Sequence, residues 1–238
     1  MFMSQSTHQS GQFTIPMAVL VSGVLIALAI VFGPSISSPQ AGQLANIADT
    51  QAAPPQNGEP SELLAADVTK DDHIRGNQNA DIFLIEYSDL DCPFCSRIHP
   101  TLEQIVTEYS NVGWVYRHNP LDSIHPEARG KAKISECIAQ IAGEEAFWQY
   151  LEINYTGGDE ADYTQYGTTQ EAVDACVSEQ ETALDNLIDS QIARAQATGG
   201  QGTPHTIIAN DDFGLSISGA QPLEVFQQIL SFMNQEEE

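Results

Sequence analysis

Two cysteines separated by two residues, Cys92-Pro93-Phe94-Cys95, are the side chains of this sequence best suited to chemistry. Such a pair can exchange disulfides: one thiolate attacks a partner's disulfide, and the second thiol then attacks the mixed disulfide and releases the partner. The pair is also a possible half of a zinc site, because His99 follows Cys95 closely. A zinc module with four cysteine ligands is disfavoured, since the chain has no second C-x-x-C pair.

The segments on either side of the pair indicate where it lies in a fold. Ile82 to Ile85 is a continuous apolar run, typical of a strand covered on both faces. After the pair, apolar residues recur at helical spacing, which predicts a helix over 94–109 that begins beside Cys92. The unpaired N–H groups and the positive dipole end of a helix start favour a thiolate. Cys92 is therefore the predicted nucleophile and Cys95 the resolving thiol.

The rest of the chain supplies the other elements of an α/β domain. The patterns predict strands at 82–87 and 112–117, helices at 126–142, 145–154, 170–178 and 183–197, a hairpin of 206–209 with 215–218, and a helix from 222 to about 233. In chain order this is βαβ, a group of helices, then ββα.

This order, the C-P-F-C pair at the first strand-to-helix junction and Thr203-Pro204 before the hairpin resemble the DsbA-like family of thiol-disulfide oxidoreductases. The resemblance covers roughly residues 67 to 233. It implies a thioredoxin-like fold with a helical insertion at about 121–180, and a protein disulfide oxidoreductase without cofactor or metal. The expected reaction forms disulfides in exported polypeptides. A reductase or isomerase would carry the same motifs, and a non-catalytic binding module or a zinc-stabilised module is the alternative of a different class.

The resemblance also implies roles for three residues outside the pair. Glu86 stands in the family's Glu-Tyr-Ser-Asp-(x2)-Cys-Pro-x-Cys pattern and is expected to relay a proton from Cys95; otherwise it is an ordinary carboxylate at a strand end. Thr203 and Pro204 match the family's cis-proline pair, which faces the two cysteines and exposes the Thr203 backbone to a substrate chain. From the sequence alone an ordinary trans proline is the more frequent case.

The remaining cysteines, Cys137 and Cys176, each share a helical face with apolar residues in the insertion. They are two buried free thiols or one structural disulfide. An oxidising compartment and an even cysteine count favour the disulfide, and many members of the resembling family carry a second cysteine pair in this insertion.

Residues around the pair bear on the direction of the reaction. Phe94 lies between the cysteines and supplies neither charge nor hydrogen-bond donor, while Asp89 and Asp91 add negative charge nearby. These features disfavour the Cys92 thiolate and predict a less oxidising pair than the strongest family members. His205, directly after the proline, either lies near the thiols or faces solvent at the start of the hairpin.

The net charge and the amino-terminal segment indicate which partners the protein has and where in the cell it lies. Eight Lys and Arg oppose 33 Asp and Glu, a net charge of −25 that argues against nucleic acid as a partner. Ile15 to Phe32 carries no charge and is long enough to cross most of a bilayer. Residues 1–14 lack the Lys or Arg of a signal-peptide n-region, so we expect an uncleaved anchor rather than a cleaved signal.

Because disulfide exchange takes place outside the cytosol, the cysteine domain is expected on the extracytoplasmic side of the cell membrane. The expected divisions are a short tail at 1–14, a transmembrane anchor at 15–32, a flexible linker at 33–66 and the folded domain at 67–235. Expected partners are exported polypeptides with cysteines, the membrane through the amino-terminal helix, and an unidentified redox partner that resets the active pair.

Overall fold

A computed structural model of the chain describes residues 59–61 and 67–234. The predicted tail, the predicted anchor and most of the predicted linker lie outside these residues. Within the described ranges, none of the helices combines the length and the apolar character needed to cross a membrane.

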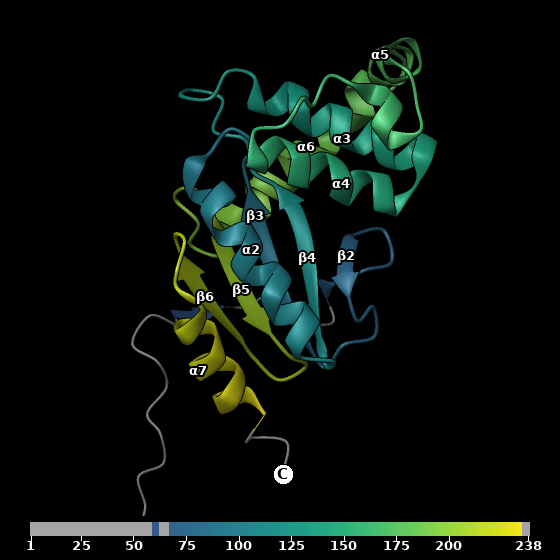
Figure 1. Ribbon diagram of the computed structural model, residues 1–238. Helices are drawn as coiled ribbons and strands as arrows, with labels where there is room; N and C mark the ends of the chain where they lie inside the picture. The colour runs from purple at the N-terminus through teal and green to yellow at the C-terminus, as the bar shows by residue number, and fades with distance from the viewer. Residues whose placement is uncertain (1–58, 62–66, 235–238) are drawn as a thin grey trace, which may run out of the picture. The chain divides into compact units, whose positions relative to one another are not determined.

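A six-stranded mixed sheet forms the centre of the domain, with strand order β1-β6-β5-β3-β4-β2 (Figure 1). The strands are β1 (Glu59–Ser61), β2 (His73–Gly76), β3 (Ile82–Ser88), β4 (Val112–His118), β5 (His205–Ala209) and β6 (Gly214–Ser218). The helical elements are α2 (Pro93–Glu108), α3 (Ala128–Ala142), α4 (Glu144–Thr156), the 3₁₀ helix η2 (Tyr163–Tyr166), α5 (Gln170–Glu179), α6 (Glu181–Ala197) and α7 (Leu223–Met233). Strands β3 and β4 are parallel, and the other neighbouring pairs are antiparallel.

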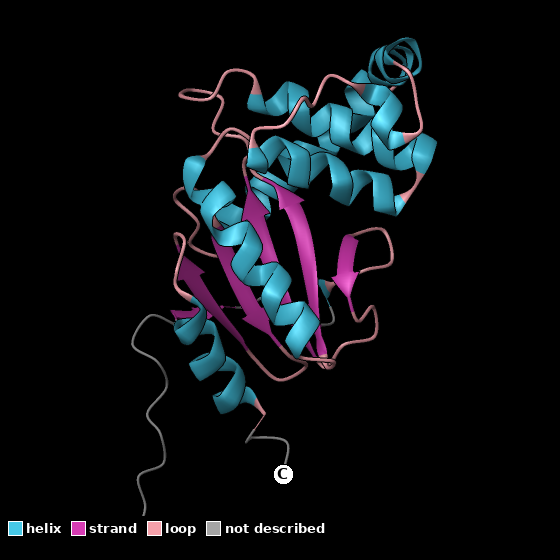
Figure 2. Ribbon diagram, in the orientation of Figure 1, coloured by secondary structure: helices cyan, strands magenta, loops and turns pink. Residues whose placement is uncertain are grey.

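Helices cover both faces of the sheet, which is why β3 is buried along its whole length. Alternate side chains of β3 point to opposite faces. Leu84 belongs to the larger core with α2 and α7, which lie on the same face in Figure 2. Ile85 belongs to a smaller core on the other face, where α6 contributes Ala195. Helices α3, α4 and α5 gather beyond the carboxyl ends of β3 and β4, the end of the sheet at which α2 begins (Figure 1).

The order βαβ, helices, ββα predicted from the sequence is confirmed, and the two outer strands are additions to it. Strand β1 lies within the segment predicted to be a linker and pairs with β6 at the sheet edge. Pro60 in β1 cannot donate to a ladder, and an edge strand is the place where that is tolerated. Strand β2 is short and only half-buried, so it has no alternating apolar pattern that would reveal it.

A disulfide between Cys137 of α3 and Cys176 of α5 fastens the insertion, with Cα atoms 5.8 Å apart. We expect the double variant Cys137→Ser/Cys176→Ser to lose about 3 to 4 kcal/mol of unfolding free energy, because the disulfide closes a loop of some 40 residues in the unfolded chain. Thermal and denaturant unfolding measure this loss. Exchange at Cys92 and Cys95 is expected to continue, and a folded double variant without exchange would contradict a purely structural role.

Charged side chains join the sheet edge to the insertion. His73 of β2 stacks on Phe147 of α4, with ring centroids 3.5 Å apart. Its Nδ1 lies 2.8 Å from Glu144 Oε2 and its Nε2 lies 3.3 Å from Glu136 Oε2. His118 Nε2 lies 3.1 Å from Glu136 Oε1. Burial opposes the charged form of His73, yet the two carboxylates outweigh it and raise the pKa of His73 to about 9. Burial also opposes the charged form of Glu136, but the histidines lower its pKa to about 2.

This cluster predicts that stability falls at alkaline pH. Charged His73 stabilises the fold fully below its unfolded pKa near 6.5, and this contribution is lost as pH rises to about 9. The loss is about 3 kcal/mol. Denaturant titrations between pH 5.5 and 9 are expected to show a smaller decline for Glu136→Gln, which is also less stable at pH 6. The same pH dependence in both proteins would contradict the assignment.

Candidate active site

The end of β3 and the start of α2 hold the two cysteines close together. Cys92 is the N-cap residue of α2, and Pro93 occupies the first turn, where its missing N–H costs no helical hydrogen bond. Cys92 is 5% exposed and Cys95 is fully buried. Both are free thiols. The predicted position of Cys92 at a helix start is confirmed.

The pKa values of the two thiols are shifted in opposite directions. The pKa of Cys92 is lowered to about 5, mainly because the Cys95 thiol donates to it, and further because the backbone N–H groups of Cys95 and Phe94 point at it; burial opposes this shift. Burial raises the pKa of Cys95 well above its usual value, and the hydrogen bond to Cys92 and the charge of Glu86 add to the effect. At neutral pH the pair is therefore a Cys92 thiolate beside a neutral Cys95 thiol.

Thr203 and Pro204 lie against this thiol although they are far away in sequence. The peptide bond between them is cis, and the Cys92 Sγ donates to the Thr203 carbonyl oxygen at 3.4 Å when protonated. The Pro204 carbonyl accepts from the backbone N–H of Gly219 at 2.8 Å, which ties this turn to the end of β6. This geometry agrees with the expectation drawn from the family resemblance, that the Thr203 backbone faces the C-x-x-C pair.

Glu86 lies fully buried in β3, on the face of the sheet that α2 covers. Its Oε1 accepts from Ser88 Oγ at 2.7 Å and its Oε2 accepts from Trp114 Nε1 at 3.0 Å. Burial raises the pKa of Glu86 to about 7 although both donors favour the charged form; the Cys92 charge raises it further. Because its pKa is close to 7, Glu86 can both take up and release a proton at neutral pH.

The acidic residues beside the pair have basic partners that the sequence did not reveal. Asp89 Oδ2 lies 2.9 Å from His125 Nδ1, and Asp91 Oδ1 lies 2.9 Å from Lys131 Nζ. The predicted effect of these carboxylates on Cys92 is weakened accordingly. Phe94 is half-exposed, and the Arg97 guanidinium carbon lies 5.0 Å from its ring centroid, so a cation stands next to this side chain.

Neither His205 nor His99 directs its ring at the two sulfurs. His205 is buried on the other face of the sheet, with its ring stacked on Tyr87 and its Nε2 3.1 Å from Thr198 Oγ1. Both positions predicted for it were wrong. His99 packs against aromatic rings of the larger core, and burial lowers its pKa to about 4. Within residues 59–61 and 67–234, no cluster of three or more His, Cys, Asp or Glu is suited to a metal ion.

Three hydroxyl groups that the sequence analysis did not single out lie behind the cysteines. Tyr155 of α4 brings its Oη to 3.0 Å from Ser88 Oγ and to 3.0 Å from Tyr116 Oη. Ser88 stands inside the Glu-Tyr-Ser-Asp pattern, which could have drawn attention to it. Tyr155 has no such signal, since its contact with Ser88 joins residues 67 positions apart.

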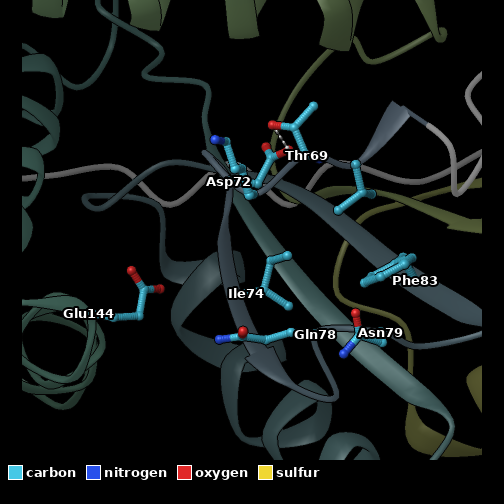
Figure 3. Close-up of a pocket in the computed structure, with 9 residues that line it drawn as sticks. Thr69, Asp72, Ile74, Gln78, Asn79, Phe83 and Glu144 are labelled. Carbon is cyan, nitrogen blue, oxygen red and sulfur yellow. Dashed lines mark hydrogen bonds between the residues drawn. The ribbon is translucent and has the colours of Figure 1, made fainter.

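Of two cavities of the described domain, one is lined in part by a residue of this hydroxyl cluster and one is not. The larger, about 570 Å³, is lined by residues such as Thr69, Ile74 and Glu144, and Figure 3 shows the Thr69–Asp72 hydrogen bond on its wall. It includes none of the cysteines. The smaller, about 350 Å³, is lined in part by His99 and Tyr155 and so reaches the rear of the hydroxyl group cluster.

Comparison with known families identifies the fold. A family model described as thioredoxin matches residues 68–231. The chain is similar to DsbA2 of Pseudomonas aeruginosa, with a TM-score of 0.62, 24% identity, and coverage of 70% of this chain and 96% of the other. It is also similar to the thiol-disulfide exchange protein α-DsbA2 of Wolbachia pipientis, with a TM-score of 0.58, 17% identity, and coverage of 67% and 86%. At these identities the structures show a shared fold.

Curated relatives match only part of the chain. A segment is 34% identical over 98 residues to the Na(+)/H(+) antiporter NhaA 3 of Salinispora tropica, which is 40% of this chain and 15% of that protein. Another match, to NhaA 1 of Salinispora arenicola, is 37% identical over 79 residues, which is 33% of this chain and 12% of that protein. The chain thus corresponds to a small part of these antiporters' length.

Proposed function

Because the chain belongs to the thioredoxin family and has the DsbA-like helical insertion in its fold, we propose that it is a protein disulfide oxidoreductase that forms disulfides in exported polypeptides. One observation carries the proposal: the lowered pKa of Cys92 beside the raised pKa of Cys95, next to the Thr203 carbonyl. A thiolate that is stable at neutral pH is a good leaving group, which favours transfer of the disulfide to a substrate.

The reaction begins with the Cys92–Cys95 disulfide. A substrate thiolate attacks Cys92 Sγ, the bond to Cys95 breaks, and its electron pair leaves on the Cys95 sulfur, which takes up a proton. A second substrate thiolate then attacks the substrate sulfur of the mixed disulfide, and Cys92 leaves as a thiolate. The substrate dithiol is oxidised to a disulfide, the enzyme pair is reduced, and an external redox partner must accept the two electrons.

Thr203 and Pro204 are proposed to hold the substrate during this exchange. The Thr203 carbonyl lies within hydrogen-bond reach of Cys92, so an extended chain that pairs with this backbone would bring its own cysteine to the exposed side of the sulfur. Glu86 is proposed to exchange the proton of Cys95.

We further propose that Ile15 to Phe32 anchors the domain to the cell membrane, with the cysteine pair on the extracytoplasmic side. The absence of charge from this stretch supports the anchor, and disulfide formation in exported chains requires a location outside the reducing cytosol. The linker that follows the anchor would keep the active site near emerging substrates.

The redox potential of the Cys92/Cys95 couple and its resting state in cells test the direction. We expect a potential between about −120 mV, as in the strongest oxidants, and about −230 mV. The pair is expected to be mostly oxidised in cells that carry the full chain. A mostly reduced pair with a potential near −270 mV would instead assign the protein to reduction or isomerisation.

A further inference from the structure

We propose that the Ser88 hydroxyl is the catalytic proton relay between Cys95 and Glu86. This inference deepens the proposed function and rests on it. Glu86 and Cys95 are the two groups between which a proton must move. Ser88 donates to Glu86 and also acts on Cys95, whose thiolate form its hydroxyl favours.

The geometry around Ser88 supports a relay. Ser88 Oγ donates to Glu86 Oε1 at 2.7 Å, a short hydrogen bond to a carboxylate. The same hydroxyl favours the thiolate form of Cys95 and so lowers its pKa slightly, against the larger effect of burial. The next residue, Asp89, directs its backbone N–H at that sulfur from 3.5 Å. The backbone of residue 89 therefore contacts the Cys95 sulfur, and the side chain of residue 88 binds the carboxylate, so this short segment lies between the two groups.

A hydroxyl is suited to this position because it can donate and accept at the same time. When Cys95 attacks a mixed disulfide on Cys92, its S–H proton moves to Ser88 Oγ while the Ser88 proton moves to Glu86 Oε1. The freed sulfur electron pair forms the bond to Cys92 Sγ, and the partner leaves as a thiolate. When Cys95 is the leaving group, the protons move in the opposite direction.

Tyr155 holds the Ser88 hydroxyl in place. Its Oη lies 3.0 Å from Ser88 Oγ, 3.0 Å from Tyr116 Oη and 3.4 Å from the Asp89 carbonyl oxygen. Burial raises the pKa of both tyrosines well above the usual range, so they stay neutral and keep their hydrogens. Tyr155 is thus a positioning residue, and it makes the relay depend on the helical insertion.

The titratable groups around Glu86 have pKa values away from pH 7, so a change of rate near pH 7 can be assigned. The titratable groups that face this region are Cys92, Cys95 and His99 from α2, Tyr116 from β4, and Tyr155 from α4. Cys92 is bound covalently in a mixed disulfide, and His99 has its pKa lowered to about 4. The Cys95 and tyrosine pKa values lie above the neutral range. A step near pH 7 in the resolving reaction therefore reports Glu86.

Quenched-flow reaction of the reduced full-length protein with oxidised glutathione tests the relay. The first step joins glutathione to Cys92, and the second releases it as Cys95 attacks; acid quenching and mass analysis separate the two. For the wild type we expect the second step to rise through pH 7 to a plateau. In Ser88→Ala the plateau is expected to fall about 100-fold, the size of a general acid–base contribution, while the first step stays within about twofold.

Ser135→Ala is the matched control, because Ser135 is also a fully buried hydroxyl but donates to the Ala132 carbonyl oxygen at 2.8 Å, away from the cysteines. It is expected to leave both steps unchanged. Tyr155→Phe should lower the plateau by a smaller factor than Ser88→Ala. A Ser88→Ala profile that moves along the pH axis with an unchanged plateau would overturn the relay, as would an unchanged profile. A wild type that never joins glutathione to Cys92 would instead refute the proposed function.

Discussion

Cys95→Ser is expected to leave substrate polypeptides attached to Cys92 as long-lived mixed disulfides, whereas Cys92→Ser is expected to capture none. The first expectation follows from the position of Cys95 one helical turn behind Cys92. An internal thiol in this position acts at an effective concentration of 10⁵ M or more. External thiols at millimolar concentration would replace it, so the lifetime of the mixed disulfide should grow by several orders of magnitude.

The second expectation follows from the unequal thiols. Cys95 is fully buried and its pKa is raised well above the usual value, so without Cys92 it is neither accessible nor ionised. Acid-quenched, alkylated cell extracts resolved without reductant show the captured species, and mass spectrometry identifies them. The double variant Cys92→Ser/Cys95→Ser is the control for non-specific capture. Capture by Cys92→Ser through Cys95 would reverse the roles assigned to the two thiols.

Glu86→Gln is expected to make the protein more stable at alkaline pH and slower in exchange. The pKa of Glu86 is about 7 in the fold and about 4.5 in the unfolded chain. Between these values the unfolded chain releases a proton that the native state keeps, so the buried carboxyl lowers stability as pH rises from 4.5 to 7. The full cost above pH 7 is about 3 kcal/mol. Glutamine does not titrate and removes it.

Denaturant unfolding at pH 4 and pH 8 measures this effect. We expect Glu86→Gln to exceed the wild type by about 1 to 3 kcal/mol at pH 8, since the lost charge-assisted bonds from Ser88 and Trp114 offset part of the gain. At pH 4 the advantage should vanish. Release of glutathione from Cys92 should slow about 100-fold at pH 8. A variant that is less stable at pH 8 and resolves normally would contradict both roles of Glu86.

The sequence was informative wherever function constrains neighbouring residues. Cys92, Cys95 and Glu86 lie on one strand-turn-helix segment, so their proximity follows from local structure. The position of Thr203-Pro204 depends on the whole fold and was available only through the family resemblance. The disulfide between Cys137 and Cys176 was inferred from the even cysteine count, the expected oxidising compartment and the family resemblance together.

Contacts between distant segments could not be predicted. Tyr155 reaches Ser88 from the insertion, and Lys131 reaches Asp91 from α3; neither residue belongs to a motif. His205 was misjudged because a residue at a strand start can face either side of the sheet, and the pairing of His205 with Tyr87 places both on the face away from α2. The register of β5 decides this, and no pattern in five residues fixes that register.

The strand at the outer edge illustrates the same limit. His73 reads as a polar residue in a charged segment, yet it is enclosed by Phe147 and two glutamates from the insertion. Its environment is produced by packing between β2 and helices more than sixty positions later. The local sequence pattern therefore identifies the central strands of the sheet, whereas the outer strand β2 depends on contacts with distant parts of the chain.

Titration of the reduced protein tests the central claim most directly. The rate of Cys92 alkylation by iodoacetamide, followed by peptide mass analysis across the pH range, gives the pKa of the attacking thiol and shows which cysteine reacts. We expect Cys92 to be modified first, with a pKa of about 5. A pKa near the ordinary thiol value of about 8.5, or modification of Cys95 before Cys92, would contradict this account of the active site.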